Sequence, residues 1–383
     1  MKIIGVICEY NPFHLGHKKQ FDAIRAEFGE DAAIVCLMSG NFVQRGYPAI
    51  FHKSLRAEAA VRCSADLVLE LPAVYALSSA EGFAAGGVKI LSQFCDCLCF
   101  GAETGTAETL MATAEGLLRP DFSEALRAEL DKGISFAAAR QAALQTMGLD
   151  ASLLISPNDI LGLEYCKAIL SQGCAMHPFV INRQGNYHAA DADAENPSAT
   201  SLRKLLQAGD PWQSYVPAVA AAVFENAPIY TLAAGERSIL AKLRTMTDTE
   251  FEALPYGSEG LWRKLMHNSR SCATLEEILT ATKSKRYTRS RLDRMVMCAF
   301  LGITEKMLTN EVPYTRILAF DDQGRLLLNE AKKTGTYVNA GESMDHPHWE
   351  LEKRCGDLYG LFCTEGVSAP GTEEARRVYY HKK

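Results

Sequence analysis

The chain has 383 residues, and its 40 Lys and Arg against 46 Asp and Glu give a formal net charge of −6. This balance argues against a protein coated all over in basic charge, although it permits a local basic patch. No apolar run approaches the roughly 18 residues that span a bilayer. The polar residues Glu9 and Asn11 follow the first apolar run too early for a signal peptide. We therefore expect a cytoplasmic protein of about two domains with no membrane association, whose oligomeric state the sequence leaves open.

Twelve cysteines raise the question of disulfides or a metal site. Cys95, Cys97 and Cys99 alternate along a predicted strand, which places three thiols on one face. No nearby CxxC pair or histidine completes a zinc site. We therefore expect small core-filling thiols in a reduced, cytosolic protein, and no metal held by the protein alone.

Apolar runs alternate with helical patterns through the first half of the chain, which is typical of an α/β fold with a buried parallel sheet and helices on both of its faces. The predicted strands are residues 1–8, 32–38, 66–71, 95–100 and 175–182, and the clearest predicted helices are 53–63 and 107–118. Helical patterns dominate from Pro217 to about Leu301, after which 316–329 predicts two short strands around an Asp-Gln-Gly turn. We predict a Rossmann-like domain over 1–234, followed by a mainly helical region over 235–383.

The first chemical signal follows the first predicted strand and reads Glu9-Tyr10-Asn11-Pro12-Phe13-His14-Leu15-Gly16-His17. Asn-Pro ends the strand, and a helix is expected to begin near His17, so its free N–H groups form a seat for a phosphate. Gly16 permits close backbone approach. His14 and His17 can donate hydrogen bonds that stabilise charge developing at an attacked α-phosphorus. The alternative is two ordinary loop histidines, but the position between strand and helix favours the phosphate site.

The second signal is Ser198-Ala199-Thr200-Ser201-Leu202-Arg203, which opens an amphipathic helix. Hydroxyls at a helix start cap it, and capping alone could explain Ser198 and Thr200. Arg203, one turn into the helix, can instead bind the β- and γ-phosphates of a nucleotide with two parallel hydrogen bonds. Alone the segment is weak evidence, but it gains weight beside the histidine motif.

Together the two motifs resemble the HIGH-type nucleotidyltransferase superfamily. The chain is similar over much more of its length to one family within it, the bacterial tRNA(Met) cytidine acetate ligases. The matching segments are residues 5–17, 38–46, 100–103, 157–165, 182–185, 187–188 and 285–291. They follow one another along the chain in the family's order, which is more specific than either short motif. The region beyond about Leu301 carries no segment that matches.

The resemblance implies that ATP and acetate form acetyl-adenylate with release of pyrophosphate. The acetyl group then passes to the exocyclic amine of the wobble cytidine of elongator tRNA(Met). Catalytic roles fall to His14, His17 and Arg203. Contacts with ATP are implied for Ile7, Cys8, Glu9, Tyr10, Asn11, Pro12, Phe13, His14, Leu15, Gly16, His17, Lys18, Lys19, Gln20, Gly101, Asn158, Asn182, Arg183, Ser198 and Thr200. Mg²⁺ is expected to be held mainly through the ATP phosphates, without a dedicated cage of protein ligands.

Three of these positions have a plain structural alternative. Gly101 follows a predicted strand and would let adenosine lie against the backbone, or it is a simple turn glycine. Asn158 offers an amide to adenine or ribose edges, or it caps a helix. Arg183 can bind a phosphate group, or it is a solvated cation in a loop.

The polar side chains at positions 41, 44 and 45 follow another predicted strand, on the side of such sheets where ligands usually bind. They could bind acetate or a tRNA base, or they could only shape the loop.

A basic segment lies between Lys283 and Arg294, where six basic residues stand against the single acidic residue Asp293. Contacts with the tRNA phosphates are predicted for part of this segment, with Tyr287 able to stack on a base. The predicted tRNA-binding residues are Lys283, Lys285, Arg286, Tyr287, Arg289 and Arg291. Two alternatives stay open: a solvated helix face, and a mobile lysine loop that closes on the triphosphate as in class I aminoacyl-tRNA synthetases.

Two competing functions remain. A small-molecule adenylyl- or cytidylyltransferase of cofactor synthesis shares the histidine motif but needs no basic C-terminal segment. A non-catalytic protein that binds a nucleotide and tRNA is disfavoured, because both phosphate-handling motifs are intact.

Overall fold

The computed structural model describes residues 1–182, 198–284, 286–309, 311–339 and 342–382. The chain forms two compact units that interleave along the sequence. Unit 1 comprises Met1–Ile7, Gln20–Val35 and Ala80–Asn186, and unit 2 comprises Cys8–Lys19, Cys36–Ser79 and Tyr187–Lys383. Each unit is defined by residues that pack together in the fold. The boundary near residue 234 between an ATP-activating and a tRNA-engaging region stays a prediction.

Unit 1 is built on strands in the order β2-β1-β6-β7, of which β2 contributes its first residues. The bounds are β1 Ile3–Cys8, β2 Ala33–Ser39, β6 Cys97–Ala102 and β7 His177–Asn182. β6 pairs in parallel with both β1 and β7. These strands confirm the predicted runs at 1–8, 32–38, 95–100 and 175–182, with ends shifted by at most two residues.

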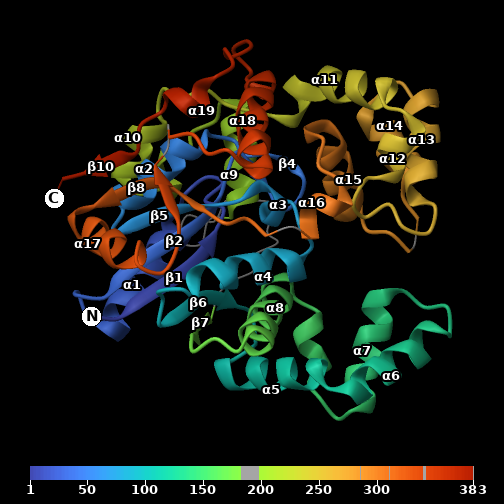
Figure 1. The fold of residues 1–383 in the computed structure, drawn as a ribbon, viewed down its shortest axis with the longest axis horizontal. Helices are drawn as coiled ribbons and strands as arrows, with labels where there is room; N and C mark the ends of the chain where they lie inside the picture. The colour runs from blue at the N-terminus through green and yellow to red at the C-terminus, as the bar shows by residue number, and fades with distance from the viewer. Residues whose placement is uncertain (183–197, 285, 310, 340–341, 383) are drawn as a thin grey trace. The chain divides into compact units, whose positions relative to one another are not determined.

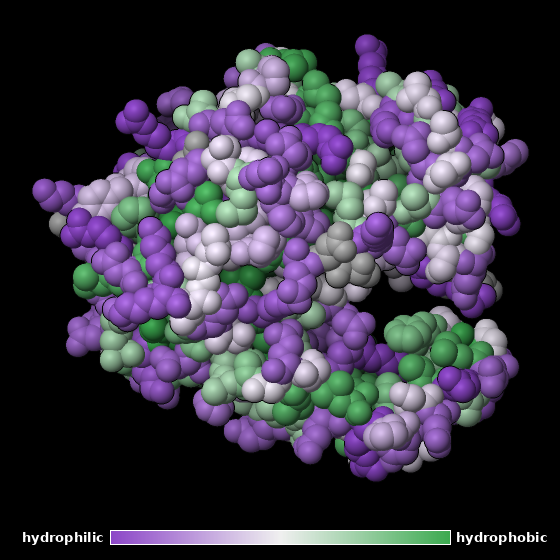
Figure 2. Space-filling view, in the orientation of Figure 1, coloured by the Kyte–Doolittle hydropathy of each residue, from purple (hydrophilic) through white to green (hydrophobic). Residues whose placement is uncertain are grey.

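The helices of unit 1 pack against one another, and one of them also packs against the strand β6. The bounds are α1 Leu15–Phe28 (from Gln20 in this unit), α4 Ala80–Leu91, α5 Ala107–Leu118, α6 Pro120–Leu130, α7 Phe136–Thr146, a 3₁₀ turn η1 at Ala151–Leu154, and α8 Pro157–Gln172. α8 packs on α4, α5 and β6. Apolar side chains such as Phe136 lie exposed over α6 and α7, where Figure 2 shows a green patch.

Unit 2 carries the strand order β10-β8-β5-β2, with β9 beside β8 (Figure 1). The strand bounds are β3 Phe42–Val43, β4 Tyr47–Pro48, β5 Leu67–Leu71, β8 Thr315–Asp321, β9 Tyr337–Asn339 and β10 Tyr379–His381. β8 pairs in parallel with β9 and β10 and antiparallel with β5, so the sheet is mostly parallel. The predicted strand at 66–71 is confirmed as β5, and the α/β fold class is confirmed with it.

The helices of unit 2 fall into a group around this sheet and a larger C-terminal group. Their bounds are α2 Lys53–Arg62, α3 Ala73–Ala76, α9 Ala199–Ala208, η2 Gln213–Tyr215, α10 Ala218–Phe224, α11 Leu232–Thr245, α12 Asp248–Glu252, α13 Leu261–Ser271, α14 Leu275–Thr282, α15 Arg289–Leu301, α16 Glu305–Thr309, α17 Asp322–Ala331, α18 Pro347–Tyr359, η3 Gly360–Phe362 and α19 Thr372–Ala375. The helices α11 to α15 enclose a core that includes Ile239, Leu265 and Met295. This confirms the mainly helical character predicted after residue 234.

The prediction of two strands over 316–329 is half wrong. The first strand exists as β8, but the second is the helix α17. Asp321 caps this helix by accepting a hydrogen bond from the Gly324 N–H at 2.9 Å. A Cβ at Gly324 would lie 2.0 Å from the backbone oxygen of Asp66, so the glycine is needed for close packing on β5 rather than for a hairpin turn.

The twelve cysteines all lie in the described residues, and none is in a disulfide. Cys97 and Cys99 are buried in β6, as the core-filling prediction requires, while Cys95 precedes the strand. None of the described helices is both long and apolar enough to cross a membrane.

Candidate active site

The histidine motif of unit 2 forms a tight loop between β1 and α1. The helix begins at Leu15, two residues before the predicted start. The carbonyl of His14 accepts the N–H groups of His17 at 2.9 Å and Lys18 at 3.2 Å, which closes the first turn. The loop is packed inward, since Tyr10 and Phe13 are almost fully buried. The motif is therefore rigid and places its two histidines at the helix N-terminus.

The two imidazoles stack on each other and are oriented by backbone donors. Their ring centroids lie 3.7 Å apart with an interplanar angle of 24°. Nδ1 of His14 accepts the Gly16 N–H at 3.1 Å, and Nδ1 of His17 accepts the His14 N–H at 3.2 Å. A nitrogen that accepts carries no proton, so each neutral ring holds its proton on Nε2. In the neutral form, each ring therefore carries its hydrogen-bond donor on Nε2, and His14 is almost fully buried.

Arg56, on α2, is a buried cation to which no sequence motif assigned a role. It is fully buried, and burial lowers the pKa of its guanidinium. It donates to the carbonyls of Phe51 at 2.9 Å and Ser39 at 3.2 Å, and also to those of Glu9 and Gly40. One guanidinium therefore holds the loops that follow β1 and β2 against each other.

Glu9 lies where these two loops meet. Its Oε1 accepts the backbone N–H of Gln44 at 2.8 Å. Loss of solvent around the side chain raises the pKa of Glu9, while the Gln44 N–H and the positive charges of Arg203, Arg56 and Arg45 act in the opposite direction. Burial outweighs these opposing effects, so the pKa of Glu9 lies above its ordinary value.

Arg203, on α9, joins this site from far along the sequence. Its guanidinium donates to the carbonyl of Asn11 at 2.7 Å, to the hydroxyl of Tyr47 at 3.4 Å and to Thr200 Oγ1 at 3.0 Å. Ser198 caps the helix by accepting the Ser201 N–H at 3.0 Å. The structure therefore brings Arg203 to the histidine loop, with Thr200 beside its guanidinium and Ser198 in a capping role.

Other residues of the predicted ATP loop contribute to packing. Tyr10 OH lies 3.2 Å from Cys36 Sγ, and Asn11 Oδ1 accepts the Ile50 N–H at 2.7 Å. Cys8 Sγ lies 3.8 Å from the carbonyl of Leu37. Pro12 is buried, Leu15, Gly16 and Lys18 are half-buried, and Lys19 is exposed. Ile7 and Gln20 fall in unit 1, where Gln20 Nε2 lies 3.5 Å from the carbonyl of Cys99.

A second group of predicted ATP residues lies in unit 1, where β6 and β7 end and α8 begins. Gly101 is inside β6 rather than after it, and it pairs with Ile181. Asn182 is exposed at the end of β7, where it pairs with Ala102. Arg183 lies outside the described residues. Gly101 and Asn182 lie near one another at the carboxyl ends of two parallel strands, the usual ligand edge of such a sheet.

Asn158 stands in the first turn of α8 and is held by Glu103, a residue to which the sequence motifs assigned no role. Its Nδ2 donates to Glu103 Oε1 at 2.6 Å, and Glu103 Oε2 accepts the Asp159 N–H at 3.0 Å. In return, the buried Asp159 carboxylate accepts the backbone N–H groups of Glu103, Thr104 and Gly105. Asn158 therefore forms part of a carboxylate-capped helix start.

In the folded structure, several basic side chains of the segment between Lys283 and Arg294 are paired with acidic side chains. Arg286 contacts Glu259 at 2.6 Å, and Arg289 contacts both Glu276 at 2.7 Å and Asp293 at 2.8 Å. Tyr287 OH donates to Glu259 at 2.8 Å, and Arg291 donates to the carbonyl of Tyr256. Lys283 is exposed at the end of α14, and Lys285 lies outside the described residues. Since α15 begins at Arg289, Arg286 lies outside the helix that carries Arg289 and Arg291, and the alternative of a solvated helix face applies only from Arg289 onward.

The loop around residue 46 packs directly on α15. Gly46 has a φ of +82°, and a Cβ there would lie 2.4 Å from backbone atoms of Asp293 and Arg294. No side chain fits in that space. The next residue, Tyr47, contacts Arg203. Within unit 2, the helix that carries part of the basic segment therefore lies one loop away from the phosphate residues.

Comparison with known proteins decides the family. A family model described as HIGH Nucleotidyl Transferase matches residues 1–373. The tRNA(Met) cytidine acetate ligase of Caldanaerobacter subterraneus subsp. tengcongensis is 38% identical over 353 residues, which cover 87% of this chain and 86% of that protein. The enzyme of the same name from Acetivibrio thermocellus is 34% identical, with 94% of each chain covered. That of Alkaliphilus metalliredigens is 32% identical, with 100% of this chain and 99% of that protein covered. The chain belongs to the tRNA(Met) cytidine acetate ligase family.

Solved structures agree with this family assignment. The crystal structure of apo Thermotoga maritima TmcAL matches over 100% of both chains with a TM-score of 0.91 and 28% identity. The same protein bound with alpha-thio ATP matches with a TM-score of 0.89, again over 100% of both chains. The resemblance deduced from the sequence motifs is thereby confirmed, and the chain is a ligase of the nucleotidyltransferase type.

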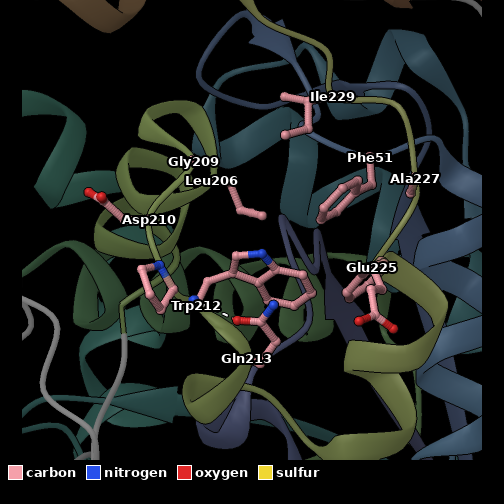
Figure 3. Close-up of a pocket in the computed structure, with 11 residues that line it drawn as sticks. Phe51, Leu206, Gly209, Asp210, Trp212, Gln213, Glu225, Ala227 and Ile229 are labelled. Carbon is pink, nitrogen blue, oxygen red and sulfur yellow. Dashed lines mark hydrogen bonds between the residues drawn. The ribbon is translucent and has the colours of Figure 1, made fainter.

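A cavity elsewhere in unit 2 is unsuited to the nucleotide of a ligase from this family. It has a volume of about 330 Å³ and lies beyond the C-terminal end of α9. Figure 3 shows Leu206, Phe51 and Trp212 pointing toward one another, while Asp210 points away. The lining contains the carboxylates Asp210 and Glu225 and no basic side chain. Such a surface repels a triphosphate, so this cavity is a poor candidate for the phosphate site.

No group of three or more His, Cys, Asp and Glu side chains that could hold a metal ion occurs among the described residues.

Proposed function

We propose that this chain activates acetate with ATP as acetyl-adenylate and transfers the acetyl group to the exocyclic amine of the wobble cytidine of elongator tRNA(Met). The family relatives are named for this class of reaction. The observation that supports the proposal is the site in unit 2, where His14 and His17 stand at the N-terminus of α1 and the Arg203 guanidinium binds the carbonyl of Asn11 in the same loop. We assign activation of ATP and acetate to residues 1–234 and tRNA engagement to 235–383.

In the first step, a carboxylate oxygen of acetate attacks the α-phosphorus of ATP, and the bond to the pyrophosphate oxygen breaks. Negative charge builds on the α-phosphate oxygens and on the leaving pyrophosphate. Nε2–H of His14 and His17 can donate to the former, and Arg203 can bind the latter. Because backbone donors and stacking already orient the rings, little reorganisation is needed when the charge appears.

In the second step, the cytidine N4 attacks the acetyl carbonyl carbon, the bond to the AMP oxygen breaks, and the amine loses one proton. When bound, Mg²⁺ supplies neutralising charge to the ATP phosphates. The described residues offer it no protein cage, so the triphosphate and water are its expected ligands.

We place the tRNA contacts on the segment from Lys283 to Arg291. Its exposed ion pairs, such as Arg286 with Glu259, are weak, so phosphate groups can compete for these arginines. The contact of Gly46 with α15 supports this placement, because it puts RNA-binding residues close to the acyl-transfer site. A reaction on tRNA also agrees with the expected cytoplasmic location.

The test is to incubate the protein with labelled ATP, acetate or another carboxylate, and bulk tRNA. Pyrophosphate release and acetyl transfer to RNA are then measured separately. We expect pyrophosphate release to require acetate and not acetyl-coenzyme A, and the label to appear on tRNA(Met). RNA acetylation supported only by acetyl-coenzyme A would contradict the proposal, and pyrophosphate release without any carboxylate would favour a cofactor-forming nucleotidyltransferase.

A further inference from the structure

Glu9 is an unexpected residue in a site that binds anions. ATP and acetate are both negatively charged, and a carboxylate beside them weakens their binding. The side chain is held in place by the Gln44 N–H at 2.8 Å, on Oε1 alone. Its other oxygen, Oε2, accepts no hydrogen bond from the described residues, and the residue is only half-buried. A carboxylate that is held in this position, with one oxygen that accepts no hydrogen bond, calls for a functional explanation.

Burial raises the pKa of Glu9 above its ordinary value, and the nearby arginines Arg56 and Arg203 donate their hydrogen bonds to other groups. Arg56 donates to the backbone carbonyl of Glu9 and not to its carboxylate. Arg203 donates to Asn11, Tyr47 and Thr200. Its second oxygen therefore remains available to a substrate.

The position of Glu9 connects the two substrates of the proposed reaction. On one side, the residue is two positions from Asn11, whose carbonyl binds Arg203. On the other side, its carboxylate binds the loop of Gln44, and two residues later Gly46 packs on α15. The loop of residues 44–46 therefore contacts Glu9 at Gln44 and the helix α15 at Gly46.

We propose that Glu9 is a catalytic residue of acyl transfer, which accepts a hydrogen bond from the exocyclic amine of the target cytosine and takes its proton. A carboxylate is the side chain that pairs with cytosine N4–H in nucleic-acid recognition. As N4 forms its bond to the acetyl carbon, the bond to the AMP oxygen breaks and one amine proton passes to Oε2. Product release returns that proton to solvent. This inference rests on the proposed function and assigns it a general base.

The test separates the two half-reactions in Glu9→Gln. The amide keeps Oε1 as the acceptor for the Gln44 N–H, so the loop stays in place, and it removes the proton acceptor. We expect the single-turnover rate of acetyl transfer to fall about a hundredfold, the lower range for loss of a general base. Because Glu9 also lies in the predicted ATP loop, tRNA-independent, acetate-dependent pyrophosphate release is expected to fall as well, but by much less than acetyl transfer. Glu58→Gln, which changes a half-buried α2 carboxylate paired with Arg62, is the matched control.

Three outcomes would overturn the assignment. Equal slowing of both half-reactions would mean that Glu9 acts on ATP or its Mg²⁺. Unchanged rates in both would mean that the carboxylate only orders the loop. A Glu9→Asp variant no faster than Glu9→Gln in acetyl transfer would show that the carboxylate is not the acceptor. A failure of the proposed function itself would appear in the unmodified protein, as a lack of acetate-dependent pyrophosphate release.

Discussion

The loops around Arg56 and the basic segment after Lys283 both carry positive charge close to the proposed site, yet the fold uses their charges differently. Arg56 is fully buried, and every hydrogen bond that it donates in the described structure goes to a backbone carbonyl. Arg286 is exposed and Arg289 is half-buried, and they meet the carboxylates of Glu259 and Glu276. The first region is a fixed scaffold, whereas the second is a set of exchangeable surface pairs.

This difference has an energetic consequence. A buried donor that is removed leaves carbonyls without a partner, and each such group costs about 1–3 kcal/mol. An exposed ion pair contributes only about 0–1 kcal/mol and is screened by salt. Mutations should therefore affect folding and catalysis around the histidine loop, but RNA affinity and its salt dependence around the basic segment.

The largest effect is expected for catalysis. His17→Ala should reduce acetate-dependent pyrophosphate release by about a hundred- to thousandfold, because it removes a donor to charge that exists only in the transition state. The thermal unfolding midpoint serves as the control and should change little, since the residue is only half-buried. An unchanged rate would remove His17 from the mechanism.

The next effect concerns stability. Arg56→Met should lower the free energy of unfolding by about 3 kcal/mol or more, because the carbonyls of Glu9, Ser39, Gly40 and Phe51 lose their donor. Arg62→Met, on the same helix but exposed and paired with Glu58, is the matched control and should cost under about 1 kcal/mol. Urea titration of both variants measures the difference. Similar losses in the two would disprove the scaffold role.

Buried charge can also be examined through pH. Burial, and next the charge of Glu70, raise the pKa of Glu352 to about 7, against the opposing charges of Lys53 and Arg316. Between pH 4.5 and 7, the unfolded chain has lost this proton while the folded protein keeps it. The contribution of Glu352 to stability therefore falls as pH rises through that window.

Glu352→Gln removes this titration but keeps the acceptor for the Ala73 N–H. Relative to the unmodified protein, the variant should gain about 1 kcal/mol or more of unfolding free energy between about pH 5 and pH 8. Glu373, whose pKa is lowered to about 2 by Lys53 and Arg316 despite burial, gives the opposite sign, because its contribution is lost as pH falls below 4.5. A stability difference for Glu352→Gln that is constant with pH would contradict the prediction.

The smallest effects are expected at the basic segment. Replacing Lys285, Arg286 and Arg289 together by Ala should weaken tRNA binding and flatten its log–log salt dependence by about 0.7–0.9 for each phosphate that the variant no longer neutralises. Adenylate formation without tRNA should survive. Collapse of adenylation with unchanged tRNA affinity would instead identify a lysine loop over ATP, and no change in either would identify a solvated surface.

The ion pairs allow a complementary test of the same segment. Replacing Glu259 and Glu276 by Gln removes the competitors of Arg286 and Arg289 and should strengthen tRNA binding at low salt. Glu330→Gln, which removes an exposed pair on α17, is the control. Weaker tRNA binding in the double variant would show that these carboxylates position the arginines rather than compete for them.

Local patterns predicted most of the sheet strands and the place of the histidine loop. Period, turn residues and strand–helix alternation are properties of short segments, so residues 1–17 could be interpreted without the rest of the chain. The pattern failed at 316–329, because Asp-Gln-Gly starts either a turn or a capped helix. That choice was decided by the packing of Gly324 on the backbone of Asp66.

The sequence by itself determined the chemistry of the motifs and the family to which they belong, because these depend on residue type and spacing. Only the tertiary structure decided the partners of each charge. It brought Arg203 to Asn11 across 192 positions, and it placed Glu259 and Glu276 beside arginines that a short stretch of sequence counts as a basic excess. Electrostatic energy depends on the distance between two charges in space, and the fold of the chain sets that distance.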